Sequence, residues 1–309
     1  MNIVPIVFCF DDNWELAAGV CITSLLENAC SSTFYDIFIL YSDLSTFQNN
    51  GHLDRLQTHY SNCKITFRCV GESFHGAFQI RGIGISTYYR LLIPEIIPEY
   101  DKIMYHDVDV IFRMDLFSLF NSIDISGYYL AGVNSPGGLN PIIRQKREKL
   151  GIGWKEYILA GNMIMNSKLL RKDGIVEQFK KEVANSAYEF QDMDIINIVC
   201  KGKIKRIPPV FCVTIEITRL AVNGTSQELY TREELAEALQ SGIIHYNGPK
   251  PWKDLCPNFD YWWEYYRKSI FFDNEFYFNF YQSKMNFLDS LSLIKRIKIL
   301  LRYFFKGNK

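Results

Sequence analysis

The sequence predicts an α/β fold in which helices flank a central sheet, followed by a small helical appendage at the C-terminal end. Short apolar runs alternate with segments of helical periodicity through the first 70 residues, a rhythm that produces parallel strands joined by helices. The chain has 309 residues, 48% of them hydrophobic and 22% charged, which is enough to bury a large core. Residues 284–309 differ from the rest because they are strongly basic and rich in aromatic residues.

The predicted elements follow one another in this order. Strands at residues 3–10, 35–43 and 63–70 alternate with helices at 14–29 and 47–60. A helix over 85–98 ends before Pro98 and leads into a strand over 102–112. Further short strands are predicted at 128–133, 160–166, 203–213 and 242–247, and further helices at 168–187, 192–200 and 231–242. The last helix begins at a Thr231 cap and ends at Gly242.

Composition narrows the class of protein. The formal net charge is zero, so no nucleic-acid partner is expected. None of the eight cysteines forms a CxxC or other zinc spacing, and Cys9, Cys200 and Cys212 lie in apolar runs, which favours reduced cytosolic thiols over disulfides. No apolar run reaches the ~18 residues that a membrane span needs. The apolar start, MNIVPIVFCF, lacks a basic leader and predicts a buried strand, so we expect a cytoplasmic protein.

The segment FDDNW, residues 10–14, follows the first predicted strand. A dinucleotide-binding fold would place a glycine-rich phosphate loop there, and the chain contains no GxxxxGK[ST] motif either. Acidic residues at this position would repel a pyrophosphate but could accept hydrogen bonds from a base or a ribose. Any bound nucleotide therefore needs a cation for its phosphates.

The segment DKIMYHDVDVIF, residues 101–112, places two aspartates in an otherwise apolar run. Residues i and i+2 of a strand point to one face, so Asp107 and Asp109 would repel each other unless a divalent cation lies between them. Two solvated acids at a strand end are the alternative, but the apolar neighbours favour burial and therefore a metal. By the same alternation, His106 is expected to point away and to pack against the sheet.

The segment HYNGPKPW, residues 245–252, supplies a histidine after a short apolar strand and a lysine on a Gly-Pro loop. A lone histidine is more often structural than a ligand, and such a lysine is usually only exposed. Taken together, however, they indicate that His245 completes the metal site and that Lys250 binds phosphate oxygens. Two carboxylates and an imidazole suit Mn²⁺ better than Mg²⁺ or Ca²⁺.

These motifs resemble glycosyltransferase family 8, which includes bacterial lipopolysaccharide galactosyl- and glucosyltransferases and, more distantly, glycogenin. The resemblance rests on FDDNW, STYYRLLIPEIIPEYDKIMYHDVDVIF, AGNMIMN, FQDMDIIN and HYNGPKPW, and it runs from residue 3 to about residue 255. It implies a GT-A fold with a Rossmann-like mixed sheet, a catalytic domain at residues 1–255 and a C-terminal region at 256–309. It also implies the retaining transfer of a hexose from UDP-glucose or UDP-galactose to a glycan or lipid-linked acceptor.

The resemblance assigns roles to individual residues. Asp107, Asp109 and His245 would bind Mn²⁺, or Mg²⁺ in its place, and the metal would bridge the diphosphate. The other expected donor contacts are Asp11 and Asn13 with uracil and ribose, Arg90 with the donor sugar or diphosphate, Gly248 and Lys250 with the phosphates, and Asp192 with the sugar hydroxyls. The expected catalytic set is Asp192, Lys250, Arg90 and Met193.

Three positions depart from the family pattern. Met193 stands where the family usually has Gln, Leu159 stands where it commonly has Asn, and many relatives have an acid near Asn134 or Ser135 that faces the acceptor. A thioether is a poor nucleophile for this chemistry, so we expect same-face attack of the acceptor hydroxyl. The alternatives are a catalytically weakened UDP-sugar-binding protein and a different metal-dependent enzyme, such as a nucleotidyltransferase or phosphatase.

The C-terminal residues predict a basic amphipathic helix. One side carries Leu291, Ile294, Ile297, Leu301 and Phe304, and another carries Lys295, Lys298, Arg302 and Lys306. Such a helix can lie on an anionic membrane surface, which predicts a peripheral location on the inner face of the cytoplasmic membrane and an acceptor such as lipopolysaccharide core. A helix packed on its own domain is the alternative.

Overall fold

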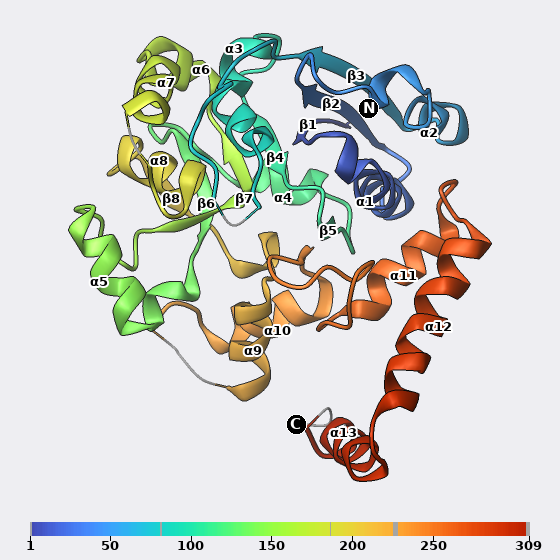
Figure 1. Ribbon diagram of the computed structural model, residues 1–309. Coiled ribbons are helices and arrows are strands. Elements are labelled where there is room, and N and C mark those ends of the chain that lie inside the picture. The colour runs from blue at the N-terminus through green and yellow to red at the C-terminus, as the bar shows by residue number, and fades with distance from the viewer. Residues whose placement is uncertain (1, 81, 186, 225–227, 307–309) are drawn as a thin grey trace.

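The structure is a computed structural model that describes residues 2–80, 82–185, 187–224 and 228–306, with only the backbone for Leu300 and residues 302–306. In this part of the chain seven strands form a mixed sheet (Figure 1). The spatial order is β3 (Cys63–Cys69), β2 (Thr33–Tyr41), β1 (Asn2–Cys9), β4 (Ile103–His106), β7 (Ile158–Met165), β6 (Leu130–Asn134) and β8 (Ile204–Arg206).

Strand direction divides this sheet into two parts. The four strands from β3 to β4 are parallel, as the alternation of strands and helices predicts. Strand β7 runs antiparallel to both β4 and β6, whereas β8 runs parallel to β6. The mixed, helix-flanked sheet predicted from the sequence is thus confirmed.

Helices cover both faces of the sheet because the buried strands are apolar on both sides. Alternate residues of β1 enter two separate core clusters, with Ile6 and Phe8 in one and Val7 in the other. The first cluster is covered by α1 (Glu15–Glu27), α2 (Asp54–His59) and α4 (Phe117–Ser122). The second is covered by α6 (Ser167–Lys172), α7 (Ile175–Asn185) and α8 (Gln191–Val199), which lie together in Figure 1.

A second, two-stranded sheet positions the candidate site. Strand β5 (Val110–Ile111) pairs antiparallel with β9 (Ile244–His245), and Val110 lies opposite His245. Val213 continues this small sheet through a parallel bridge to Ile244. Beneath it, α11 (Phe259–Lys268) contributes Trp262 and Trp263 to a third core cluster that includes residues of β5 and β9.

Several predicted elements are broken where the local chemistry opposes them. The strand predicted at 102–112 is interrupted between β4 and β5, where its partner changes from β7 to β9. The backbone N–H of Asp107 still donates to the Gly161 carbonyl oxygen of β7 at 2.7 Å, whereas the Asp109 carbonyl oxygen accepts from the N–H of Tyr246, next to β9, at 2.9 Å. The strand predicted at 203–213 is reduced to β8, since Pro208 and Pro209 lack N–H donors. The helix predicted at 168–187 is split into α6 and α7 at Gly174, which adopts a positive φ.

Two further predicted helices are partly 3₁₀ in character. Residues 85–98 form a 3₁₀ helix at Ile85–Leu92, followed by the short α3 (Ile93–Ile96). Residues 47–60 form a 3₁₀ turn at Phe47–Asn49 before α2 begins. The helix predicted at 231–242 is confirmed as α10 (Arg232–Ser241), which follows α5 (Pro141–Lys149) and α9 (Ile215–Asn223) and starts at a capping box between Thr231 and Glu234.

The C-terminal helices extend from the body of the molecule (Figure 1). Phe280 of α12 (Asn274–Ser290) packs on Trp263, and α12 then leads away to α13 (Leu293–Lys306). The side chains of Ile294, Ile297 and Leu301 are 68%, 45% and 48% exposed, so they are not buried against the rest of the chain. The amphipathic helix predicted from the sequence also includes Arg302, Phe304 and Lys306, whose side chains lie outside the described part of the chain.

No helix among the described residues is long and apolar enough to cross a bilayer.

Candidate active site

Two aspartates and a histidine converge where β4, β5 and β9 meet. One ligand atom each from Asp107, Asp109 and His245 lies within 4.8 Å of the others. The Nε2 atom of His245 is 3.5 Å from Asp107 Oδ2 and 3.2 Å from Asp109 Oδ1. The predicted grouping is present, but strand alternation does not cause it, because Asp107–Asp109 lies between strands. The pairing of Val110 with His245 brings the three together.

The donor set fits a divalent cation. Asp109 and His245 are each only 7% exposed, and two carboxylates held this close repel each other unless positive charge lies between them. Gly161 borders the same space, since a Cβ there would stand 2.3 Å from His245 Cε1 and 2.6 Å from Asp107 Oδ2. This close approach of the β7 backbone explains why the position is glycine.

Lys250 supplies positive charge at the same place. Its Nζ is 2.5 Å from Asp109 Oδ2 and donates a second hydrogen bond to the Tyr246 carbonyl oxygen at 2.6 Å. Burial alone would raise the pKa of Asp109, but the neighbouring His245 and Lys250 bring that pKa well below its ordinary value. Burial likewise opposes protonation of His245, yet Asp109 raises the pKa of His245 well above its ordinary value.

A buried arginine links this cluster to a third carboxylate. Arg90 is 6% exposed, and its guanidinium lies 2.9 Å from Asp107 Oδ1 and 3.3 Å from Asp192 Oδ2. It also donates to the Ala160 carbonyl oxygen at 2.8 Å. Burial raises the pKa of Asp192, although Arg90 acts in the opposite direction. Arg90 therefore fixes Asp107 and Asp192 relative to each other.

The remaining predicted donor-binding residues are placed as follows. Asp11 follows β1 and accepts a hydrogen bond from the backbone N–H of Asn13 at 3.0 Å. Asn13 and Gly248 are exposed. Met193 follows Asp192 in α8 and packs, partly buried, against the second core cluster.

The other two departures from the family pattern lie on neighbouring strands. Leu159 in β7 is partly buried against the first core cluster. Asn134 and Ser135 are buried at the end of β6, where Ser135 Oγ accepts a hydrogen bond from Arg147 at 2.8 Å.

His106 packs inside the sheet, as its place in the sequence predicts. Its Nδ1 lies 2.8 Å from Asn162 Oδ1, and its ring meets the edge of Phe112 at a centroid distance of 5.0 Å. Burial lowers the pKa of His106 to about 3, so the ring is neutral at ordinary pH.

Four further residues contact the site, although the sequence motifs do not assign them a role in it. Thr87 donates its hydroxyl to Asp192 at 2.6 Å, and Tyr105 donates its hydroxyl to Asp107 at 2.6 Å. Gly161 provides the close approach described above, and Cys212 Sγ lies 3.5 Å from His245 Nδ1. Thr87, Tyr105 and Gly161 lie within the recognised motifs, whereas a cysteine in an apolar run gives no signal of its own.

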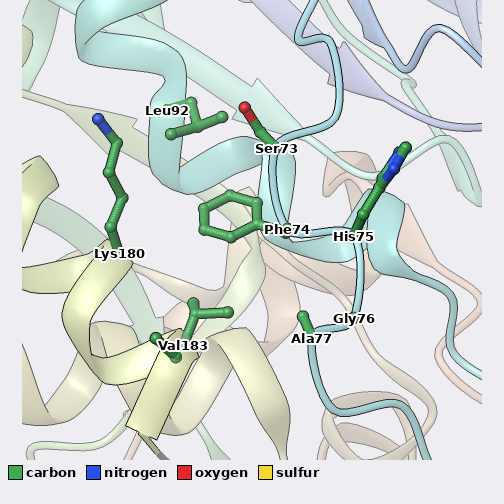
Figure 2. A pocket seen from close by; sticks show the side chains of 9 residues that line it. Ser73, Phe74, His75, Gly76, Ala77, Leu92, Lys180 and Val183 are labelled. Atoms are coloured by element: carbon green, nitrogen blue, oxygen red, sulfur yellow. The ribbon is translucent and has the colours of Figure 1, made fainter.

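A separate cavity of about 350 Å³ lies between α7 and the loop after β3 (Figure 2). Its lining includes the Phe74 ring, which lies between Leu92 and Val183, and Lys180 of α7 (Figure 2). None of Asp107, Asp109 and His245 lines this cavity.

Comparison with known proteins agrees with this geometry. The profile of glycosyl transferase family 8 matches residues 5–256. A putative glycosyltransferase of Haemophilus influenzae is 30% identical over 264 residues, covering 81% of this chain and 73% of that protein. The lipopolysaccharide 1,2-glucosyltransferase of Escherichia coli is 23% identical over 85% of this chain and 75% of its own length.

A solved structure extends this likeness to the fold. The galactosyltransferase LgtC, in complex with donor and acceptor sugar analogues, matches with a TM-score of 0.74 and 27% identity, covering 88% of this chain and 98% of LgtC. The mixed sheet described above is therefore the GT-A arrangement of such glycosyltransferases. By its sequence and its fold, this chain belongs to glycosyl transferase family 8, a family of sugar-transferring enzymes.

Proposed function

We propose that the protein transfers a hexose, glucose or galactose, from a UDP-sugar to a glycan acceptor with retention of anomeric configuration. The observation that carries this proposal is the cluster of Asp107, Asp109 and His245, with Lys250 beside it and Arg90 leading to Asp192. This arrangement offers hard oxygen ligands for a cation, a lysine ammonium for phosphate, and a fixed carboxylate for sugar hydroxyls.

The site residues have distinct tasks in this mechanism. Asp107, Asp109 and His245 hold Mn²⁺, or Mg²⁺ in its place, and Asp11 and Asn13 contact the uracil and ribose. When bound, the metal supplies Lewis-acid stabilisation of the negative charge on the departing diphosphate. Gly248 and Lys250 bind the phosphates. For this, Lys250 leaves Asp109, which it contacts at 2.5 Å.

Asp192 and Arg90 orient the donor. Asp192 accepts hydrogen bonds from the sugar hydroxyls, and Arg90, in contact with Asp107 and Asp192, holds both carboxylates for the donor sugar and diphosphate. Positioning alone can contribute several orders of magnitude to a rate. The buried pair of Arg90 and Asp192 is therefore central to the proposal.

The acceptor hydroxyl attacks from the face that UDP leaves, and a phosphate oxygen takes its proton. Two observations support this route over a covalent enzyme intermediate. Met193 presents a thioether where the family resemblance places Gln, and Asp194 already accepts hydrogen bonds from the Tyr157 hydroxyl at 2.5 Å and the Phe190 backbone N–H at 2.9 Å. Mass spectrometry of the protein quenched during turnover tests the route, and a glycosylated Asp192 or Asp194 contradicts it.

The acceptor is proposed to be a lipopolysaccharide or another cell-surface glycan, since relatives include a lipopolysaccharide 1,2-glucosyltransferase. We also propose a catalytic domain at residues 1–255 and a membrane-associating region at 256–309. The exposed Leu293, Ile294 and Ile297 and the exposed Lys295 and Lys298 of α13 support this assignment, because apolar and basic side chains together favour anionic membrane surfaces.

Sedimentation with phosphatidylglycerol vesicles tests the membrane assignment. Removal of residues 292–309, or the double change Lys295→Glu and Lys298→Glu, is expected to release the protein, while UDP-sugar hydrolysis persists. The double change Lys64→Glu and Lys201→Glu on other exposed surfaces is the matched control and should still sediment. A truncated protein that still sediments with vesicles contradicts a membrane role for α13.

The activity itself is tested by release of UDP from a panel of UDP-sugars with Mn²⁺. We expect hydrolysis of UDP-glucose or UDP-galactose, lost on addition of EDTA and in Asp109→Ala, and retained in Asp124→Ala, which removes an exposed carboxylate. Tight UDP binding without turnover on any sugar or acceptor would favour the second candidate, a weakened UDP-sugar-binding protein, which Met193 and Leu159 motivate.

A further inference from the structure

The orientation of His245 determines whether it can bind a metal. Its Nε2 faces Asp107 and Asp109 at 3.5 and 3.2 Å, and its Nδ1 faces the opposite way. A neutral imidazole carries one proton, on one nitrogen or the other. Nε2 can offer a lone pair to a cation only in the tautomer that carries the proton on Nδ1, and that N–H then needs an acceptor.

Cys212 is placed to be this acceptor. The Cys212 Sγ atom lies 3.5 Å from His245 Nδ1 and is the hydrogen-bond partner of Nδ1 among the described residues. Cys212 is fully buried, with no exposed surface, so water does not compete for the contact. Sulfur accepts hydrogen bonds only weakly, but an N–H pointing at no acceptor in a dry site would be costly.

The backbone holds the two side chains in register. The backbone N–H of His245 donates to the Val213 carbonyl oxygen at 3.0 Å, and the N–H of Val213 donates to the Ile243 carbonyl oxygen at 2.7 Å. Gly161 closes the remaining side of the ring, since a Cβ there would touch both Cε1 and Nδ1 of His245. The ring therefore cannot rotate toward another partner without moving β7 or the segment around Cys212.

We propose that Cys212 is a positioning residue, which accepts the Nδ1 proton of His245 in a hydrogen bond and so keeps Nε2 free to bind the metal. This inference rests on the proposed metal-dependent function. It assigns a role to a side chain that touches neither the donor nor the metal. Partners of this kind typically change metal affinity by about 10–100-fold when they are removed.

The test compares three variants of the full-length protein by titration with Mn²⁺, with free Mn²⁺ read by electron paramagnetic resonance. Cys212→Val keeps a similar volume and removes the acceptor, so we expect Mn²⁺ binding to weaken by about 10–100-fold. Cys212→Ser keeps an acceptor and is expected to bind Mn²⁺ more tightly than Cys212→Val does, close to the wild type. Cys63→Val changes a buried cysteine of β3 and should bind Mn²⁺ as the wild type does.

The outcomes separate this inference from the proposed function. If the wild type binds no Mn²⁺ and no other divalent cation, the proposed function fails. If the wild type binds Mn²⁺ and Cys212→Val binds it equally well, the positioning role is wrong while the function stands. Equal losses in Cys212→Val and Cys212→Ser, with unchanged thermal unfolding, also overturn the role, because the variant that retains an acceptor should rescue binding.

Discussion

Replacement of Gly161 by alanine gives the sharpest test of the candidate site. The added Cβ would stand 2.3 Å from His245 Cε1 and 2.6 Å from Asp107 Oδ2. Carbon atoms in ordinary contact are about 3.5–4.0 Å apart, so His245, Asp107 or β7 must shift by about 1 Å. Metal–ligand distances tolerate only about 0.2 Å. The shift therefore removes at least one ligand, and we expect Mn²⁺ affinity to fall at least about tenfold.

The assay pairs Mn²⁺ titration with urea unfolding. Overpacking of this kind typically lowers the free energy of unfolding by about 1–3 kcal/mol, so a stability loss alone is not diagnostic. Gly19→Ala is the matched control, because its Cβ would meet the Phe271 ring at a similarly close 2.5 Å. It should lose stability but keep Mn²⁺ affinity. A folded Gly161→Ala variant that binds Mn²⁺ as tightly as the wild type would refute the reasoning.

Three further predictions concern other residues. Lys250→Met should lower UDP-sugar hydrolysis by about 100-fold and strengthen Mn²⁺ binding in the absence of nucleotide, because Asp109 loses its 2.5 Å competitor; weaker Mn²⁺ binding contradicts this. The pKa of His106 is about 3 against an ordinary 6.5, so the unfolded chain binds the extra proton first as pH falls below 6.5. Stability should drop by about 2 kcal/mol between pH 7.5 and 5 in urea unfolding, and His106→Gln should lack this part of the dependence. Arg113 donates to the Ala238, Leu239 and Gly242 carbonyl oxygens at the end of α10. Arg113→Met should therefore lower the free energy of unfolding by about 2–3 kcal/mol without changing Mn²⁺ affinity. An unchanged melting temperature refutes the capping role of Arg113.

The sequence predicts the part of this molecule that depends on local periodicity. The first three strands and α10 appear close to their predicted positions, because each has an apolar pattern or a cap that reports directly on its own backbone. Breaks are harder to predict. The interruption after His106 separates a segment that pairs with β7 from one that pairs with β9, and both partner strands lie far away in the sequence.

The site residues also divide into those that a local pattern reveals and those that depend on a tertiary contact. Asp107 and Asp109 stand out as acids in an apolar run, but the pairing of β5 with β9 that delivers His245 is a tertiary contact. The segment HYNGPKPW still predicts that ligand, from a histidine after a short apolar strand and a lysine on a Gly-Pro loop, and the resemblance to known glycosyltransferases implies the same role. Cys212 escaped prediction because its role depends on where its neighbour's ring points, which no local pattern encodes.

The pairing of β5 with β9 also has a consequence for how the protein folds during synthesis. Asp109 and Lys250 are 141 residues apart, and closing so long a loop is entropically costly and slow. On the ribosome, the segment that contains Asp107 and Asp109 emerges long before β9 exists to receive it. Until then Asp109 lacks its basic partners, His245 and Lys250, so we expect the region around β5 and β9 to order last and to be the first region lost under mild denaturant.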